Sequence, residues 1–203
     1  MTFLLQRTSI PSLFLFIMLL ATISVNTTLN SAFAANAHEE TKETELVSGS
    51  AQDFDFIFGE WTITHKRLAK RMAGSDEWLT FETNYEAWPI LGGAANEDKA
   101  FGEVGGDYFE GRSLRTYDAA KDEWTIYWMD TSNPQLIEQV RGQFTDGVGL
   151  FYGEEAYEGK TYRMRFEWKK ISDDELHWDQ AFQDPDTKDW EVNWIMEFRR
   201  NTN

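Results

Sequence analysis

The stretch that decides the fold is FDFIFGEW, Phe54 to Trp61, which continues directly into the alternating segment WTITH that ends at His65. The stretch gathers three phenylalanines, an isoleucine and a tryptophan within eight residues. Strict alternation of apolar and polar residues is typical of a β-strand with one buried face. We interpret Asp53 to Phe58 as a short helical turn that plugs one end of a small barrel, and the segment after it as the first strand.

The chain upstream has the parts of a secretory signal peptide in residues 1–34. A single cation, Arg7, precedes a mostly apolar run from Ile10 to Val25, and Ala32-Phe33-Ala34 is a small-x-small cleavage site. The alternative is an uncleaved membrane anchor, because the run approaches the length of a span. Pro11 and several polar residues interrupt it, so we expect cleavage, no stable membrane insertion afterwards, and an exported protein that is periplasmic or secreted.

Composition separates a linker from a folded domain. Residues 35–52 contain no aromatic residue and are rich in Glu, Thr and Ser, which predicts a flexible linker. All nine tryptophans and all seven tyrosines lie within residues 53–200, which we assign to the barrel domain. The chain has no cysteine, and this excludes thiol catalysis and thiolate metal sites.

The charge argues against a nucleic-acid partner. Removal of Arg7 with the signal segment leaves 18 basic against 35 acidic residues, a net charge of −17 in the mature chain. Such a surface repels phosphate backbones and anionic lipid heads. Solubility is the simplest explanation for this acidity.

Turn signals such as Asp146-Gly147 and Glu158-Gly159 divide the domain into short runs. We predict strands at 60–67, 78–88, 94–102, 108–117, 123–130, 137–145, 148–156, 160–170, 175–183 and 189–200. Residues 68–74 are predicted to form either a helical turn or a long hairpin loop. About ten sequential strands predict an all-β fold, an up-and-down antiparallel β-barrel that closes on itself and leaves no free edge.

Alternation also predicts which side chains face the interior. The inward sets are Trp124, Ile126 and Trp128; Tyr162, Met164, Phe166 and Trp168; Leu176, Trp178, Gln180 and Phe182; and, in the last run, Trp190, Val192, Trp194, Met196 and Phe198. In that last run Glu191, Asn193 and Glu197 are predicted to face outward. The prediction is an aromatic interior with a charged exterior.

Three polar residues share the inward phase. His65 is in phase with Trp61 and Ile63, Gln180 is in phase with its aromatic neighbours, and Arg115 shares a face with Tyr117 although Leu114 leaves that face ambiguous. Buried polar groups must be hydrogen-bonded, so these residues either satisfy one another or contact a ligand. A hydrogen-bonded structural histidine is the commoner outcome.

The triplet Gly59-Glu60-Trp61 resembles the Gly-x-Trp motif of the calycins, which include lipocalins, fatty-acid-binding proteins and nitrobindin-like barrels. This resemblance implies that Trp61 closes the barrel bottom against an arginine near the end of the last strand. Arg199 or Arg200 stands where that arginine is needed, and we assign closure to Trp61 and Arg199. A guanidinium stacks favourably on an indole.

The ordered segments Phe54 to Arg67, AWPILGG (87–93), SLRTYD (113–118), WTIYW (124–128) and Trp190 to Arg199 are similar to a bacterial family of unknown function with lipocalin-like barrels. The resemblance covers most of residues 53–200 and implies a fold without an activity. Nitrobindin-like barrels hold haem through a histidine near the barrel end. The last predicted strand has no histidine and His177 is out of phase, so no cofactor is predicted, and haem would have to use His65.

Three hypotheses about function follow. In the first, the barrel binds a small apolar or aromatic molecule through six residues: His65, Arg115, Trp128, Trp178, Gln180 and Trp194. In the second, an enzyme uses His65 as general base beside Arg115 or Arg165. In the third, the domain is a structural or interaction module with a filled core. The chain has three histidines and no Gly-x-Ser-x-Gly elbow, so we predict no metal site and assign no catalytic residue.

Overall fold

The computed structural model describes residues 49–202, and the predicted signal segment and most of the predicted linker lie outside the described residues. The elements are η1 (Asp55–Ile57), β1 (Gly59–Leu68), β2 (Trp78–Ile90), η2 (Leu91–Gly93), β3 (Ala95–Val104), β4 (Asp107–Asp118), β5 (Glu123–Asp130), β6 (Ile137–Thr145), β7 (Val148–Tyr157), β8 (Lys160–Lys170), β9 (Glu175–Gln183) and β10 (Trp190–Arg200). Every predicted strand is present, with ends within two residues of the prediction.

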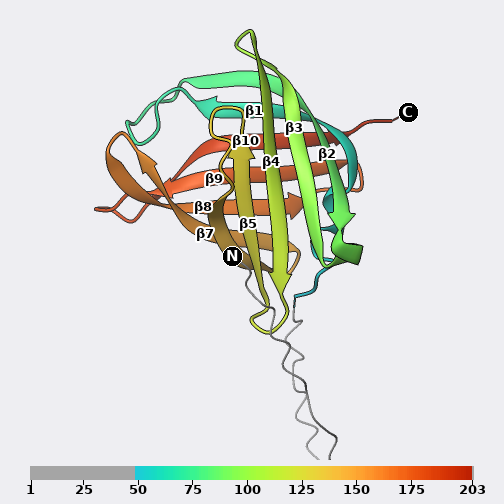
Figure 1. Ribbon diagram of the computed structural model, residues 1–203. Helices are drawn as coiled ribbons and strands as arrows, with labels where there is room; N and C mark the ends of the chain where they lie inside the picture. The colour runs from blue at the N-terminus through green and yellow to red at the C-terminus, as the bar shows by residue number, and fades with distance from the viewer. Residues whose placement is uncertain (1–48, 203) are drawn as a thin grey trace, which may run out of the picture. The chain divides into compact units, whose positions relative to one another are not determined.

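The ten strands form one closed antiparallel barrel in which each strand pairs with its neighbours in sequence, and β1 pairs with β10 to complete the ring. In Figure 1, β3, β4 and β5 cross in front of β8, β9 and β10. The prediction of an all-β, up-and-down barrel with a short helical turn before β1 is confirmed. Within residues 49–202, no helix is long and apolar enough to cross a membrane.

The FDFIFGEW stretch closes one end of the barrel. Phe54 is fully buried, and its ring centroid lies 5.0 Å from that of Trp124 and 4.9 Å from that of Phe144. The indole Nε1 of the buried Trp61 donates a hydrogen bond of 2.8 Å to the carbonyl of Ile57, which ties η1 to β1. Aromatic pairs in edge-to-face geometry add to the stability gained from their burial.

The arginine that covers Trp61 is Arg200, and the prediction of Arg199 is wrong. The guanidinium carbon of Arg200 lies 3.9 Å from the indole centroid of Trp61, and its Nη1 donates to the carbonyl of Phe58 at 3.0 Å. Arg199 has the opposite strand phase and pairs with exposed Glu175 on the outer face. Gly59 has φ of +111°, and a Cβ there would meet Arg200 Nη1 at 2.9 Å, which explains the glycine of the Gly-x-Trp motif.

The predicted inward set of the last strand is wrong in its first half because β10 contains a bulge. The register with β9 shifts between Val192 and Trp194, and Asn193 is fully buried instead of facing outward. Trp190 packs on the outer face beside the exposed Tyr152, with ring centroids 6.2 Å apart. An extra residue in one strand reverses the alternation on one side of the bulge.

The described end of the predicted flexible linker is bound to the barrel. The backbone N–H of Gly49 donates to Asp122 at 3.0 Å, and the Tyr117 hydroxyl donates to the carbonyl of Gly49 at 2.7 Å. The backbone N–H of Ser50 donates to the Asp53 carboxylate at 2.9 Å. Contact with the barrel therefore extends upstream at least to Gly49, within the predicted linker.

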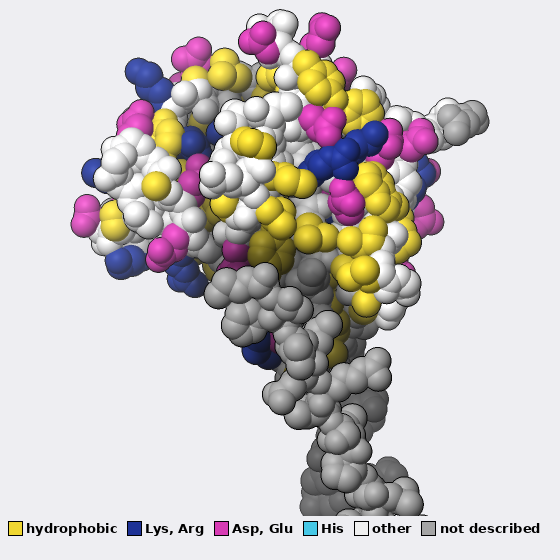
Figure 2. All heavy atoms as spheres, in the orientation of Figure 1, with side chains coloured by type: hydrophobic (Ala, Val, Ile, Leu, Met, Phe, Trp, Pro, Cys, Tyr) yellow, Lys and Arg dark blue, Asp and Glu magenta, His cyan; other side chains and the backbone are white. Residues whose placement is uncertain are grey.

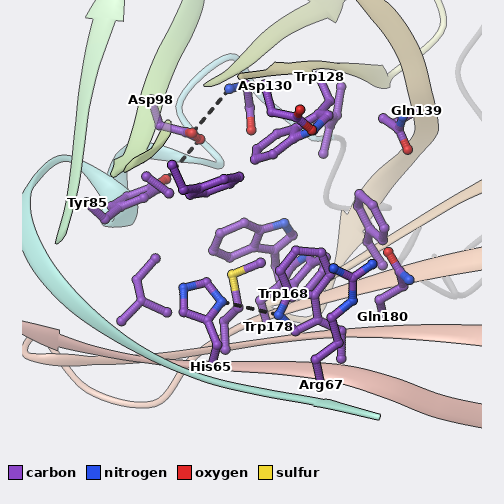
Figure 3. A pocket seen from close by; sticks show the side chains of 18 of the residues that line it. His65, Arg67, Tyr85, Asp98, Trp128, Asp130, Gln139, Trp168, Trp178 and Gln180 are labelled. Atoms are coloured by element: carbon purple, nitrogen blue, oxygen red, sulfur yellow. Dashed lines mark hydrogen bonds between the residues drawn. The ribbon is translucent and has the colours of Figure 1, made fainter. Parts of the chain in front are cut away.

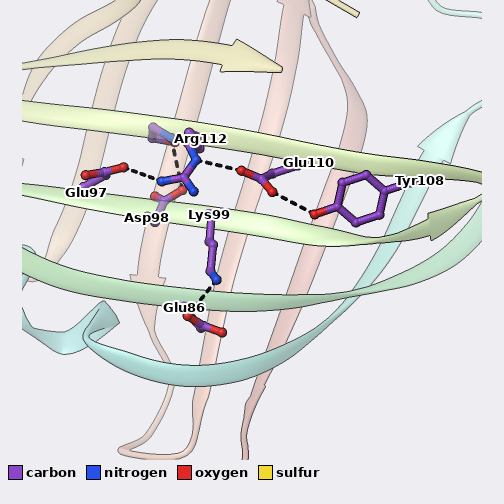
Figure 4. Close-up of polar contacts among 8 residues, drawn as sticks. Glu86, Glu97, Asp98, Lys99, Tyr108, Glu110 and Arg112 are labelled. Carbon is purple, nitrogen blue, oxygen red and sulfur yellow. Dashed lines mark hydrogen bonds and ion pairs between the residues drawn. The ribbon is translucent and has the colours of Figure 1, made fainter. Parts of the chain in front are cut away.

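The outer face carries charged ladders between strands. Arg112 of β4 pairs with Glu97 of β3 at 2.7 Å and with Glu110 at 2.8 Å, and Tyr108 donates to Glu110 at 2.7 Å (Figure 4). Cross-strand pairs of this kind contribute modestly to stability when they are exposed to solvent. Figure 2 shows acidic side chains spread over the visible face instead of gathered in one patch.

Candidate functional site

A cavity of about 450 Å³ occupies the barrel between the aromatic plug and the opposite end, which we call the mouth. Its walls are mainly aromatic: Phe109, Trp128, Phe166, Trp168, Trp178, Trp194 and Phe198. Binding sites for small molecules have this size, with apolar walls and a few polar groups. The hypothesis of a filled core requires side chains to occupy this space. They do not, because the cavity remains open inside the barrel.

All six residues predicted to contact a ligand line this cavity: His65, Arg115, Trp128, Trp178, Gln180 and Trp194. In Figure 3, His65 and Arg67 project from one wall toward Trp128 and Asp130 on the other. Alternation was sufficient to place these residues inside because none of them lies on the side of the β10 bulge where the phase is reversed. Whether they bind a ligand stays a prediction.

His65 is held on both sides by the protein. Its Nε2 lies 2.8 Å from the Thr83 hydroxyl, and its Nδ1 accepts a hydrogen bond of 3.2 Å from the indole N–H of Trp194. Because an indole nitrogen is only a donor, Nδ1 must be unprotonated, and the neutral ring then carries its proton on Nε2 and donates it to Thr83. Phe81 stacks on the imidazole with ring centroids 4.4 Å apart.

These contacts suit a structural histidine better than a reactive one. Burial, with a smaller effect from Arg67, lowers the pKa of His65 from 6.5 to about 3. A general base needs a lone pair that reaches the substrate, and a haem ligand needs one that reaches the iron. Both ring nitrogens of His65 already face protein partners, so the geometry does not favour either role.

Arg115 belongs to a buried polar cluster on the β3–β4 wall. It forms an ion pair with Asp98, and both side chains are almost completely buried. Asp98 also accepts a hydrogen bond of 3.0 Å from the Tyr85 hydroxyl, and burial raises the pKa of Tyr85 well above its usual value, so it stays a donor. Burial lowers the pKa of Arg115, but Asp98 and Tyr85 raise it more, and the charge is retained.

The other predicted amide and indole groups are also positioned by neighbours. Gln180 donates a hydrogen bond of 2.9 Å to Asn193 at the β10 bulge, so the bulge fixes the amide of a residue that lines the cavity. Trp178 meets Trp194 edge to face, with centroids 5.7 Å apart. Both contacts hold polar or aromatic groups at fixed positions along one side of the cavity.

At the mouth, Trp128 is anchored by Asp130 and accommodated by a glycine. The Trp128 indole N–H donates to Asp130 at 2.9 Å, and a Cβ at Gly111 would lie 2.2 Å from the Trp128 ring. Partial burial raises the pKa of Asp130, but hydrogen bonds from Ser132 and Trp128 lower it below its usual value. The ring can therefore lie this close to β4 only because position 111 has no side chain.

The segment predicted as a helical turn or a hairpin loop is a hairpin loop, residues 69–77 between β1 and β2. Arg71 in this loop pairs with Glu155 at 2.8 Å, and its guanidinium carbon lies 4.0 Å from the Tyr157 ring centroid. The backbone N–H of Met72 donates to Glu191 at 2.6 Å. These contacts hold the loop against the β7–β10 side of the mouth.

Several cavity residues were not among the predicted site residues, and the charged ones are Arg67, Asp98, Asp130 and Glu155. Arg67 has the same phase as His65 two positions earlier, so alternation alone could have found it. Asp98 lies in a run with few apolar residues, where no pattern marked the inward face. Within residues 49–202, no group of three His, Asp or Glu side chains is arranged to hold a metal ion.

Comparisons with known proteins identify the fold alone. No family model matches the chain, and no curated protein matches it either. Among solved structures, the S-type phycobiliprotein lyase CPES from Guillardia theta is similar, with a TM-score of 0.52 over 76% of this chain and 94% of that chain, at 8% sequence identity. The chain thus has a lipocalin-like barrel, and the resemblance to a particular bacterial family stays a prediction.

Proposed function

We propose that the barrel binds a small apolar or aromatic molecule in its interior. The observation that carries this proposal is the cavity of about 450 Å³ with aromatic walls and a small number of oriented polar groups. A domain selected only for stability would be expected to fill such a space, because internal voids cost free energy. The contents of the cavity would then be a ligand instead of core side chains.

The fold comparison guides the choice of test compounds. The similar barrel is named as a phycobiliprotein lyase, so a bilin belongs in the panel beside a fatty acid, a retinoid, haem and a phenol. Four of the nine tryptophans, at positions 128, 168, 178 and 194, line the cavity. A bound molecule would contact several of them, and we expect intrinsic fluorescence to change on titration with any compound that enters.

A cavity-filling variant tests the location of binding. Ala100 lines the cavity and is buried, so Ala100→Leu would place three extra carbon atoms in the space. The matched control is Ala156→Leu, which makes the same change at an exposed position on β7. We expect Ala100→Leu to weaken binding at least tenfold and Ala156→Leu to leave it unchanged.

Circular dichroism and thermal unfolding would establish that both variants fold. No fluorescence change and no bound mass for any of the five compounds would contradict the proposal. Equal affinity in the wild type and in folded Ala100→Leu would place binding outside the cavity and contradict it as well.

We also propose that the protein acts after export, on the basis of the signal-peptide pattern in residues 1–34. The measurement is the N-terminal sequence of the mature protein together with cell fractionation. Cleavage near Ala34 and recovery outside the cytoplasm are expected. An intact N-terminus in the cytoplasmic fraction would contradict this part of the proposal.

A further inference from the structure

Arg67 is held at the mouth of the cavity by a chain of contacts. Its guanidinium carbon lies 4.5 Å from the ring centroid of Trp194, and the two residues are partners in the β1–β10 register. Trp194 donates to His65, and His65 in turn contacts Thr83. The aromatic platform under Arg67 is therefore fixed by one partly buried and one buried hydrogen bond, and the guanidinium is positioned before any ligand enters.

Arg67 forms no direct ion pair in the part of the chain that the structure describes, and Glu155 and Asp130 attract its charge only from a greater distance. No carboxylate of residues 49–202 lies within 4.0 Å of it, and its side chain makes no hydrogen bond there. The other arginine that lines the cavity, Arg115, is neutralised by Asp98, and Arg71 beside the mouth is neutralised by Glu155. A partly buried, unpaired cation is unfavourable, and a bound anion would relieve that cost.

The surroundings of Arg67 restrict the kind of anion. A guanidinium presents parallel N–H donors that match a carboxylate in a bidentate pair. Asp130 and Glu155 also line the cavity and interact electrostatically with Arg67, so they would repel a dianion such as a phosphate monoester more strongly than a monoanion. The aromatic walls beyond Arg67 suit an apolar body attached to that single charge.

We propose that Arg67 binds the carboxylate of an aromatic or conjugated apolar ligand whose body lies between Trp178 and Trp128, an inference that rests on the proposed function of the cavity. Arg67 would then set the specificity of the barrel for acids over neutral molecules of the same shape. His65 would act as a positioning residue, because it orients the Trp194 platform.

The test uses two pairs of compounds that differ in charge but have nearly the same body: 2-naphthoic acid with 2-naphthamide, and retinoic acid with retinol. Binding to the mature protein is measured by tryptophan fluorescence and by calorimetry at pH 7. We expect at least one acid to bind the wild type at least tenfold more tightly than its neutral partner.

Three variants connect that preference to Arg67. Arg67→Gln should lower the affinity for the acid at least tenfold while changing the affinity for the neutral partner less than threefold. Arg67→Lys keeps the charge but loses the bidentate geometry, and we expect an intermediate, several-fold loss. The matched control is Arg163→Gln, because Arg163 is an exposed arginine on the outer face that stacks on Tyr152, 4.8 Å from its ring centroid.

The outcomes separate the two proposals. If none of the four compounds binds the wild type, the proposed function fails for this ligand class and the inference fails with it. If acids and neutral partners bind equally, or if folded Arg67→Gln keeps the full preference for acids, the cavity binds ligands but the role of Arg67 is wrong. Should Arg67→Gln not fold, the wild-type preference and Arg67→Lys decide the question.

Discussion

Replacing Asp98 with asparagine removes the carboxylate that neutralises Arg115 inside the barrel while keeping the shape of the side chain. Both side chains are 2% exposed, so water cannot take over the role of the counter-ion. Asparagine has a single acceptor oxygen, so it can still accept from the Ser113 N–H, 3.2 Å from Asp98 Oδ1, but it places an amide NH2 where Asp98 Oδ2 accepts from the Tyr85 hydroxyl at 3.0 Å. The variant therefore loses the ion pair and the acceptor of the Tyr85 hydroxyl, and breaking a buried ion pair on one side costs about 3–5 kcal/mol.

For a domain of this size, that loss corresponds to a decrease in Tm of roughly 6–20 °C. Urea unfolding of Asp98→Asn, followed by tryptophan fluorescence, measures the free energy directly. The control is Asp118→Asn, whose partner Lys121 lies 2.8 Å away at the surface, and we expect it to cost less than about 1 kcal/mol.

A double variant tests whether the cost of Asp98→Asn comes from leaving the charge of Arg115 buried without a partner. Combining Asp98→Asn with Arg115→Met removes both charges, and we expect it to recover at least about 2 kcal/mol relative to Asp98→Asn alone, because replacing both partners of a buried pair is often nearly neutral. A cost of Asp98→Asn below about 1 kcal/mol, or additive effects in the double variant, would refute the reasoning.

Two further predictions concern the closed end and the histidine. Arg200→Met should destabilise the barrel by about 1–3 kcal/mol, because Arg200 both covers Trp61 and bonds to the carbonyl of Phe58, whereas Arg199→Met should change stability by less than about 0.5 kcal/mol in the same urea unfolding experiment. Equal effects of the two variants would contradict this assignment of the closing arginine. The pKa of His65 is about 3 in the folded protein and near its ordinary value of 6.5 in the unfolded chain. Between these two pH values the unfolded chain therefore binds one more proton at His65 than the folded protein does. Stability should then fall as the pH drops from about 6 to 3, with His65 contributing up to about 1.4 kcal/mol per pH unit, and unfolding curves of His65→Gln should show a shallower slope. Identical pH slopes for the wild type and His65→Gln would show that His65 does not carry this proton linkage.

The positions of the strands were predictable because the signals are local. Asp146-Gly147 and Glu158-Gly159 each form a tight turn whose conformation depends on the residues in the turn itself, with positive φ at both positions of each pair. Alternation then assigns the inner face wherever a strand is regular, as it does for His65. The same rule fails in β10, because the bulge near Asn193 arises from pairing with β9 and leaves no mark in the local sequence.

The candidate site was predictable in part for the same reason. His65 and the tryptophans at positions 128, 168, 178 and 194, which alternation places inward, do line the cavity, whereas Trp190 does not. The partner of Arg115 could not be predicted, since Asp98 is distant in sequence and lies in a run without an apolar pattern. The lack of a direct ion pair for Arg67 is likewise a property of the assembled barrel, because the acidic side chains are placed by other strands.

The sequence by itself determined that the chain forms a closed antiparallel barrel with an aromatic interior, since periodicity and turn chemistry act over a few residues. It also determined that FDFIFGEW leads into the first strand and that arginines end the last one. Only the tertiary structure decided that Arg200 covers Trp61, that the interior encloses a cavity, and that Arg67 faces it without a direct ion pair. These features depend on the register between strands and on side chains brought together across the barrel, and register is a long-range property of the fold.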